Sequence, residues 1–316
     1  MAEKKERVLQ RPRMRRLGWA VAVLAGLLLV SVSLHSVSLT GRRRTAHVVA
    51  VCGPAPRLRL VYGVFSMARL YRERAIVRDT WMKLAGTCSD AGGARACVDV
   101  RFVLGRVEPG LWERIRAENA THGDIVQLDI PENKDAGKLQ FWFEYASVNF
   151  ADAQYIGKGD MDTFVLLHQL VDVHLSRLPV ADSVSHHLPV VNDEAAVYFG
   201  RIGTWDWCAG GPHCPKTFVF MLGQFYALSM PLVQYITDPV NAVRVHALDD
   251  IVSADDVQMG YWLHGYPGPI THYALLEEHQ PWLHPVKNIK SFPQIMDQIL
   301  SDKSAPRNLH KAFFDQ

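Results

Sequence analysis

The sequence predicts an α/β protein with a doubly wound, mostly parallel sheet, helices on both faces of that sheet, and an N-terminal transmembrane helix. Apolar runs rich in Val, Ile, Leu, Phe and Tyr alternate with longer stretches of helical spacing. Strands that alternate with helices in this way form parallel sheets covered on both faces. A long uncharged segment near the N-terminus predicts the membrane helix.

The expected strands and helices alternate through the first half of the chain. We expect strands at residues 58–66, 98–104, 125–130 and 155–157, and helices that include residues 74–81, 111–119 and 138–149. After Leu170 the pattern becomes irregular, which predicts loops and mixed strands laid over the sheet edge. An acceptor-binding site is expected among these loops.

The N-terminal segment from Leu17 to Leu39 contains no Asp, Glu, Lys or Arg over 23 positions, enough to cross a bilayer as a helix. Seven basic residues precede it and three follow closely, which favours a cytosolic N-terminus. We expect a cytosolic tail at residues 1–16, an uncleaved signal-anchor at 17–39, a stem at 40–57 and a lumenal domain at 58–316. A cleaved signal peptide is the alternative, with small-x-small sites at residues 31–33 or 36–38.

Composition and cysteine usage agree with a globular lumenal domain. The chain is 48% hydrophobic and 21% charged, and beyond residue 44 it carries 24 basic and 30 acidic residues, which gives no reason to expect a nucleic-acid partner. Five cysteines fit an oxidising compartment, where Cys88–Cys97 and Cys208–Cys214 are candidate pairs and Cys52 is left over. The spacing leaves the connectivity open.

Two carboxylates, Asp160 and Asp162, mark the end of the apolar run Y-I-G-K-G-D-M-D-T-F-V-L-L. Mg²⁺ and Mn²⁺ prefer carboxylate, water and phosphate oxygens, and they usually reach the protein through one or two carboxylates. Ligands of doubly wound sheets bind beyond the carboxyl ends of the strands. The pair therefore predicts a metal site that holds a nucleotide-sugar, with a solvated acidic turn as the alternative.

Seven segments in the same order resemble the β1,3-galactosyl- and β1,3-N-acetylglucosaminyltransferase family, in particular its kinetoplastid members that use UDP-galactose or UDP-N-acetylglucosamine. These segments are E-R-A-I-V-R-D-T-W (73–81), F-V-L-G (102–105), H-G-D-I-V-Q-L-D (122–129), K-G-D-M-D-T-F-V (158–165), Y-F-G-R (198–201), G-Q-F-Y-A-L-S (223–229) and D-D-V-Q-M-G (255–260). The resemblance covers most of the expected lumenal domain.

The resemblance implies a GT-A-like fold in a single-pass type II protein of the Golgi membrane. It implies inverting, Mn²⁺- or Mg²⁺-dependent transfer of galactose or N-acetylglucosamine from a UDP-sugar to a glycan acceptor, in β1,3 linkage. The acceptor would be carried by a glycoprotein or a glycolipid. The one N-glycosylation sequon, at Asn119, is usable only in a lumenal domain.

The resemblance also implies roles for individual residues. Asp160, Asp162 and His284 would bind the metal, and Asp160 would also lie against the nucleotide. Arg74 and Arg78 are expected to face the nucleotide, because arginine suits phosphate oxygens, although helical arginines are more often solvated.

The general base implied by the resemblance is Asp256, which would take the proton from the acceptor hydroxyl. The alternative for Asp255 and Asp256 is a pair of acids that stabilises a helix N-terminus. Aromatic residues between positions 205 and 226 offer a stacking face for an acceptor sugar, although core packing is the commoner fate of such residues. These residues are Trp205, Trp207, Phe218, Phe220, Phe225 and Tyr226.

The chain departs from the family pattern at several positions. Met161 replaces the middle aspartate of a triple, Phe225 replaces a glycine, and only Lys138 remains of an Asn-Leu-Thr-x-Lys segment. Lys158 is expected to pair with an acid of the sheet. The departures keep a second hypothesis open, in which the chain is a catalytically weak relative that acts as a binding partner or chaperone of another transferase. A hydrolase that uses the same acids is a third.

Overall fold

The computed structural model describes residues 58–88, 96–132, 137–178, 196–205, 218–241 and 254–301. The expected tail, membrane segment and stem lie outside these residues, as do Cys52, Cys208, Cys214 and Trp207. Among the helices that the structure describes, none combines the length and the apolar character that a membrane crossing requires.

A seven-stranded sheet forms the centre of the described chain, with the strand order β3-β2-β1-β4-β7-β6-β8. Its strands are β1 (Leu58–Phe65), β2 (Ala96–Leu104), β3 (Ile125–Gln127), β4 (Tyr155–Asp160), β6 (Val197–Trp205), β7 (Phe218–Ser229) and β8 (Thr271–Leu275). Strands β3, β2, β1 and β4 are mutually parallel, as are β6 and β8, while β7 is antiparallel to both β4 and β6. The sheet is therefore mostly parallel, as expected.

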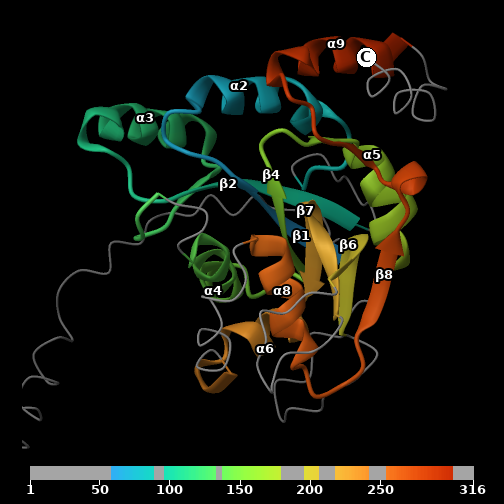
Figure 1. Cartoon of the computed structure of the whole chain (residues 1–316). Helices are drawn as coiled ribbons and strands as arrows, with labels where there is room; N and C mark the ends of the chain where they lie inside the picture. The colour runs from blue at the N-terminus through green and yellow to red at the C-terminus, as the bar shows by residue number, and fades with distance from the viewer. Residues whose placement is uncertain are drawn as a thin grey trace, which may run out of the picture. The chain divides into compact units, whose positions relative to one another are not determined.

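Helices cover both faces of this sheet, which confirms the doubly wound arrangement. The α-helices are α2 (Tyr71–Asp79), α3 (Trp112–His122), α4 (Leu139–Asn149), α5 (Leu167–Gln169), α6 (Met230–Thr237), α8 (Asp255–His264) and α9 (Phe292–Ser301). Short 3₁₀ or π turns lie at Trp81–Lys83, Pro109–Leu111, Leu170–His174, Leu175–Arg177, Glu277–His279 and Ile289–Ser291. In Figure 1, α2, α3 and α9 lie on one side of the strands, and α4, α6 and α8 lie on the other.

The strand residues explain the two-sided cover. In β1 the side chains of Leu60, Tyr62 and Val64 pack into one apolar cluster, which includes residues of α2 and α9. Val61 points the opposite way into a second cluster, with residues of α4, α6 and α8. Because a strand exposes alternate side chains to opposite faces, a continuous apolar run needs a helix layer on each face.

The second half of the chain differs from the expectation of strands laid over the sheet edge. Strands β7, β6 and β8 pair edge-on and extend the sheet beyond β4. Phe225 in β7 lies opposite Gly159 in β4, so the antiparallel strand runs directly beside the end of β4. The residues after β4 therefore meet side chains from both halves of the chain.

A second, two-stranded sheet joins β5 (Phe164–Val165) to β9 (Trp282–Leu283) in antiparallel pairing. It brings the region near residue 283 to the loop that follows β4. The expected Cys88–Cys97 disulfide is present and links the loop after α2 to β2. Asn119 is an exposed residue of α3, and its side-chain oxygen accepts a hydrogen bond from the Ile125 backbone N–H at 3.0 Å.

Candidate active site

The end of β4 sends its side chains alternately to two environments. Lys158 and Asp160 lie two residues apart, and the Lys158 ammonium donates to the Asp160 carboxylate at 2.9 Å. Gly159 lies between them where no side chain fits, since a Cβ there would stand 1.8 Å from the Tyr62 hydroxyl. Met161 is partly buried against the apolar core. The methionine that replaces the middle aspartate of the motif is thus a packing residue.

Asp160, Asp162 and His284 form the one group of three candidate metal ligands found among the described residues. Their ligand atoms all lie within 4.8 Å of one another. The His284 Nε2 atom lies 3.4 Å from an Asp162 carboxylate oxygen, and both aspartates remain about half exposed, at 40% and 46%. Two carboxylates and an imidazole suit Mn²⁺, and the open side leaves room for oxygen atoms of a substrate.

The small sheet explains how His284 reaches this position. Val165 pairs with Trp282, and Phe164 pairs with Leu283. Just beyond, the Val286 backbone N–H donates to the Asp162 carbonyl oxygen at 3.0 Å. These two backbone connections lie on either side of His284 and fix its approach to Asp162. We call residues 160–163, which contain both aspartates, the metal loop.

The N-terminus of α8 adds two more carboxylates to the site. Asp255 lies 2.9 Å from the Lys158 ammonium, which also donates to the Gly223 carbonyl oxygen at 3.0 Å. Asp256 accepts hydrogen bonds from the Gly223 and Val257 backbone N–H groups, each at 2.9 Å. Acids in the first turn of a helix are stabilised by its dipole, so these carboxylates satisfy the structural alternative while also lying beside the metal loop.

The electrostatics reflect carboxylates crowded around one lysine. Burial raises the pKa of Asp160 above its usual value, the Lys158 charge opposes the rise, and Asp255 and Asp162 add to it. Burial also works to raise the pKa of Asp162, but His284 and Lys158 outweigh it and the pKa is lowered. For Lys158, burial works to lower the pKa, but Asp160 and Asp255 outweigh it and the pKa is raised. The site is a net negative cluster that a divalent cation would neutralise.

The structure places Arg74 and Arg78 in another environment. Arg74 is fully buried, bonded to Glu118 through two nitrogens and to the Met67 carbonyl oxygen. Arg78 is bonded to Glu118 and Asp124. Both guanidinium groups join α2 to α3, and Arg78 also reaches Asp124, just before β3. Neither contacts the carboxylates of the metal loop in these interactions.

The aromatic residues expected as a stacking face lie mainly in the core. Phe225 is fully buried and stacks on Trp282 with ring centroids 4.6 Å apart. Phe218, Phe220 and Tyr226 are also buried. Core packing, the commoner fate of such residues, describes these four, and the Phe225 departure from the family pattern is absorbed by the core.

One important part of the site was not identified from the sequence. Gly223 connects the lysine to Asp256 through its carbonyl and its N–H, and a Cβ there would lie 3.2 to 3.5 Å from Lys158, Asp255 and Asp256. Only its backbone bonds to these groups, so the sequence indicated no chemical role for Gly223, although it opens the family-like segment 223–229. The position of Lys158 did carry one, because a residue two before Asp160 on a strand lies on the same side.

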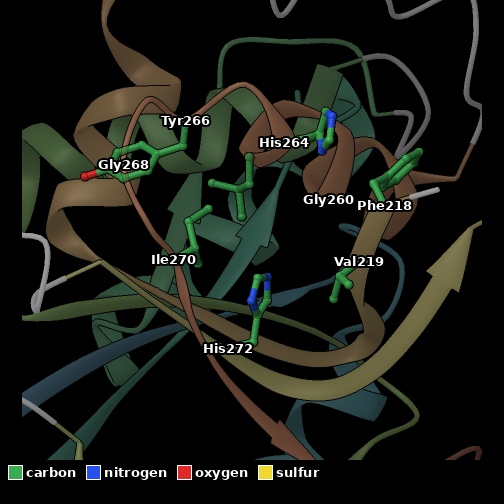
Figure 2. Close-up of a pocket in the computed structure, with 9 residues that line it drawn as sticks. Phe218, Val219, Gly260, His264, Tyr266, Gly268, Ile270 and His272 are labelled. Carbon is green, nitrogen blue, oxygen red and sulfur yellow. The ribbon is translucent and has the colours of Figure 1, made fainter. Parts of the chain in front are cut away.

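A separate cavity of about 320 Å³ lies at the opposite end of α8. Its lining includes Phe218, Gly260, His264 and His272, and Figure 2 shows the two imidazole rings with the hollow between them. None of the site's carboxylates lines this cavity. It is therefore a distinct feature of the fold.

Comparisons with known proteins point to one family. Residues 72–266, more than half of the chain, match the family model described as galactosyltransferase. The probable beta-1,3-galactosyltransferases 1 and 3 of Arabidopsis thaliana are 28% and 27% identical over 221 and 217 residues, covering 65% and 66% of this chain. The chain spans about half of their length, 53% and 50%. Beta-1,3-galactosyltransferase pvg3 of Schizosaccharomyces pombe is 36% identical over 87 residues, 27% of this chain and 22% of that protein.

Solved structures show more distant likeness. The glycosyltransferase GlyE of Streptococcus pneumoniae TIGR4 aligns with a TM-score of 0.38 and 11% identity, covering 83% of this chain and 52% of that one. The mannosyltransferase PcManGT of Pyrobaculum calidifontis, solved with GDP-Man and Mn²⁺, aligns with a TM-score of 0.37 and 14% identity, covering 82% and 64%.

Proposed function

Because the chain belongs to the galactosyltransferase family, we propose that it is a metal-dependent hexosyltransferase that transfers galactose from UDP-galactose to a glycan hydroxyl in β1,3 linkage. The observation that carries the proposal is the meeting of two carboxylate pairs, one on the metal loop and one on α8, around a single buried lysine. The choice of galactose over N-acetylglucosamine is supported by the names of the relatives. The GT-A-like fold belongs to the same proposal.

The charges of the described site support metal dependence. A UDP-sugar brings a diphosphate, whose developing negative charge must be stabilised as the sugar leaves. Lys158 has three N–H donors, and these are taken by Asp160, Asp255 and the Gly223 carbonyl. A divalent cation held by Asp160, Asp162 and His284 would supply the positive charge that the leaving diphosphate requires.

Asp256 is the better candidate for the general base, because Asp255 is already paired with the Lys158 ammonium. Each carboxylate oxygen of Asp256 accepts one backbone N–H, from Gly223 or from Val257, and keeps a second lone pair for the proton of an acceptor hydroxyl. In a single displacement the acceptor oxygen bonds to the anomeric carbon as the bond to UDP breaks. The configuration inverts, and the hydroxyl proton passes to the Asp256 carboxylate.

The positions of Met161 and Phe225 in the structure give no reason to favour a non-catalytic relative. Met161 packs against the apolar core, Phe225 lies within it, and all the acids that the chemistry needs remain in place. A binding partner or chaperone would need no open pair of metal-binding carboxylates. We therefore place the transferase above the non-catalytic alternative.

The decisive experiment uses the purified lumenal portion with Mn²⁺, a panel of UDP-sugars and a panel of p-nitrophenyl glycosides. We expect UDP release from UDP-galactose that depends on Mn²⁺, and a disaccharide product when a suitable glycoside is present. Preferred turnover of UDP-N-acetylglucosamine would change the donor assignment. Donor turnover without any sugar product across the panel would favour the hydrolase, and absence of donor binding would favour the chaperone.

For the cellular setting we propose a single-pass type II protein of the Golgi membrane. The support is the apolar segment at residues 17–39 with its basic flank, together with the Cys88–Cys97 disulfide, which is typical of an oxidising compartment. The glycan acceptor would then reach the site on a glycoprotein or a glycolipid within the same lumen.

A further inference from the structure

Lys158 is almost completely buried, with 1% of its side chain exposed, yet it lies among carboxylates from two different elements. It holds Asp160, at the end of β4, and Asp255, at the start of α8, each at 2.9 Å. An ammonium ion removed from water costs several kcal/mol unless it is fully paired. The pairing here is complete, because the third donor goes to the Gly223 carbonyl at 3.0 Å.

A closed set of contacts leads from this lysine to the candidate base. The carbonyl oxygen of Gly223 accepts from Lys158, while the N–H of the same residue donates to Asp256 at 2.9 Å. Asp255 precedes Asp256 in the first turn of α8, so the Lys158–Asp255 ion pair fixes the helix end that carries the base. The position of Asp256 is thus determined twice, through the helix and through β7.

A second buried lysine provides a natural comparison. Lys138 is 2% exposed, and its ammonium is bonded to Glu132 at 2.6 Å and to the Ser66 carbonyl oxygen at 2.7 Å. Both ammonium groups lie near the Phe65 ring, at 5.5 Å for Lys138 and 5.3 Å for Lys158. The two lysines share burial and neighbourhood, but of the two it is Lys158 that pairs with acids of the metal loop and of α8, whereas Lys138 pairs with Glu132.

We propose that Lys158 is a positioning residue that couples the metal loop to the base: it sets the placement of Asp256 through Asp255 and Gly223 while it holds Asp160 for the metal. This inference rests on the proposed transferase function. Its physical basis is that one cation separates and orients two carboxylates that would otherwise repel each other. Removing the cation frees the N-terminus of α8 to move away from β4, and a displacement of about 1 Å can cost 100-fold in rate.

The test is a double-mutant cycle of Lys158→Met with Asp256→Asn, measured as UDP-galactose turnover at saturating Mn²⁺ and donor, with the best glycoside acceptor or with water. We expect Lys158→Met to lower kcat by about 10–100-fold in the wild-type background. In the Asp256→Asn background the same change should cost less than about threefold, because the group that it positions no longer acts. Any change in Mn²⁺ affinity should be the same in both backgrounds, since Asp160 loses the same partner in each.

The matched control is Lys138→Met, which removes an equally buried ammonium ion. Its effect on kcat, whatever its size, should be the same with Asp256 and with Asn at that position. If Lys158→Met does not fold, Asp255→Asn takes its place, because it breaks only the contact to α8. We expect Asp255→Asn to show the same dependence on Asp256 while leaving Mn²⁺ affinity nearly unchanged.

The outcomes distinguish the positioning role of Lys158 from the proposed transferase function. Equal losses from Lys158→Met or Asp255→Asn in both backgrounds, in a wild-type protein that turns over UDP-galactose, would overturn the positioning role and leave the transferase intact. Wild-type protein that turns over no UDP-sugar would contradict the transferase, and the positioning role would fall with it.

Discussion

At the scale of single residues, the candidate site brings Asp160 and Asp162, at and just beyond the end of β4, close to Asp256 at the start of α8. The first two acids stand out in the sequence at the end of an apolar run, whereas Asp256 is a candidate through the family resemblance. The partners of Arg74 and Arg78 were harder to predict from the sequence, because an arginine on a helix suits a phosphate or a carboxylate equally well. In the structure both arginines bond to Glu118, 40 or more residues away in sequence. Only tertiary structure shows that contact.

Asp162→Ala should abolish turnover and most Mn²⁺-dependent UDP binding, because it removes one of three clustered ligands. The fold should persist, since the side chain is 46% exposed and the bond from Val286 uses the backbone. Calorimetry of UDP binding with and without Mn²⁺ measures the effect. Asp129→Ala is the control, because that carboxylate is 93% exposed and paired with Arg106 elsewhere. Unchanged metal dependence in Asp162→Ala would place the metal at another site.

Asp256→Asn should leave UDP and Mn²⁺ affinity nearly unchanged, because the amide preserves the size of the side chain and lies outside the candidate ligand set. Transfer should fall by about 10²–10⁴-fold, the usual contribution of a positioned proton acceptor. Donor affinity, Tm and transfer rate are measured on the same variant. Nearly normal transfer with a lowered Tm would show that Asp256 only stabilises the helix end, and would make Asp255 the next candidate.

At the scale of elements, the ion pairs between α2 and α3 connect the helix layer to the loop after β1. Glu118 bonds to Arg74 and Arg78, while Arg74 also holds the Met67 carbonyl oxygen. Burial works to raise the pKa of Glu118, but the two arginines outweigh it and the pKa lies below its usual value of 4.5. This group therefore stabilises the protein above pH 4.5, and the contribution is lost as the pH falls through the lower folded-state pKa.

Glu118→Gln should therefore lower Tm at neutral pH. The difference in stability between the variant and wild type should shrink as the pH drops below 4.5. The variant leaves the buried Arg74 guanidinium with a neutral partner, while Arg78 keeps Asp124. The loss should cost about 3 kcal/mol in unfolding free energy. Urea unfolding at pH 7 and at pH 3.5 measures the two differences. Glu113→Gln, an exposed change on the same helix, is the control. A difference that does not depend on pH would contradict the role of the charge.

Helices and strands were predicted well where their apolar residues follow a regular period. They were predicted poorly where pairing with distant strands determines the structure. β1, β2, α3 and α4 appear close to their expected bounds. The sequence did not predict β6, β7 and β8 as parts of the main sheet, because their registers are set by pairing with β4 and with one another rather than by local spacing. The β5–β9 pair, four residues in all, is too short to leave any periodic signal.

At the scale of the whole molecule, His174 should contribute to a loss of stability as the pH falls from 6.5 to 4. Burial, together with the charge of Arg177, lowers the pKa of His174 from 6.5 to about 4, and its ring packs against Phe199 and Tyr273. A neutral buried histidine stabilises the fold above pH 6.5, and this contribution of at most about 3 kcal/mol is lost as the pH falls to 4. His174→Phe keeps an aromatic ring and should flatten the decline. Denaturant unfolding at pH 7, 5.5 and 4.5 tests it, and a parallel decline in both proteins would contradict it.

The full chain should behave as an integral membrane protein whose catalytic portion lies in the lumen. In sealed microsomes, protease should remove only the short N-terminal tail, and glycosidase should shift the mass if Asn119 carries a glycan. Alkaline carbonate extraction should leave the chain in the pellet. A soluble secreted product that begins near residue 40 would show that residues 17–39 are a cleaved signal.

The candidate metal site joins Asp162 to His284, residues that the sequence separates by more than a third of the chain. A site closed by such a distant contact forms late in folding, because the entropy of closing a long loop must be overcome first. During synthesis the sheet strands up to β7 are complete before His284 has left the ribosome. The metal could therefore bind only after His284 has been synthesised. A nascent chain would carry the aspartates long before it could use a nucleotide-sugar.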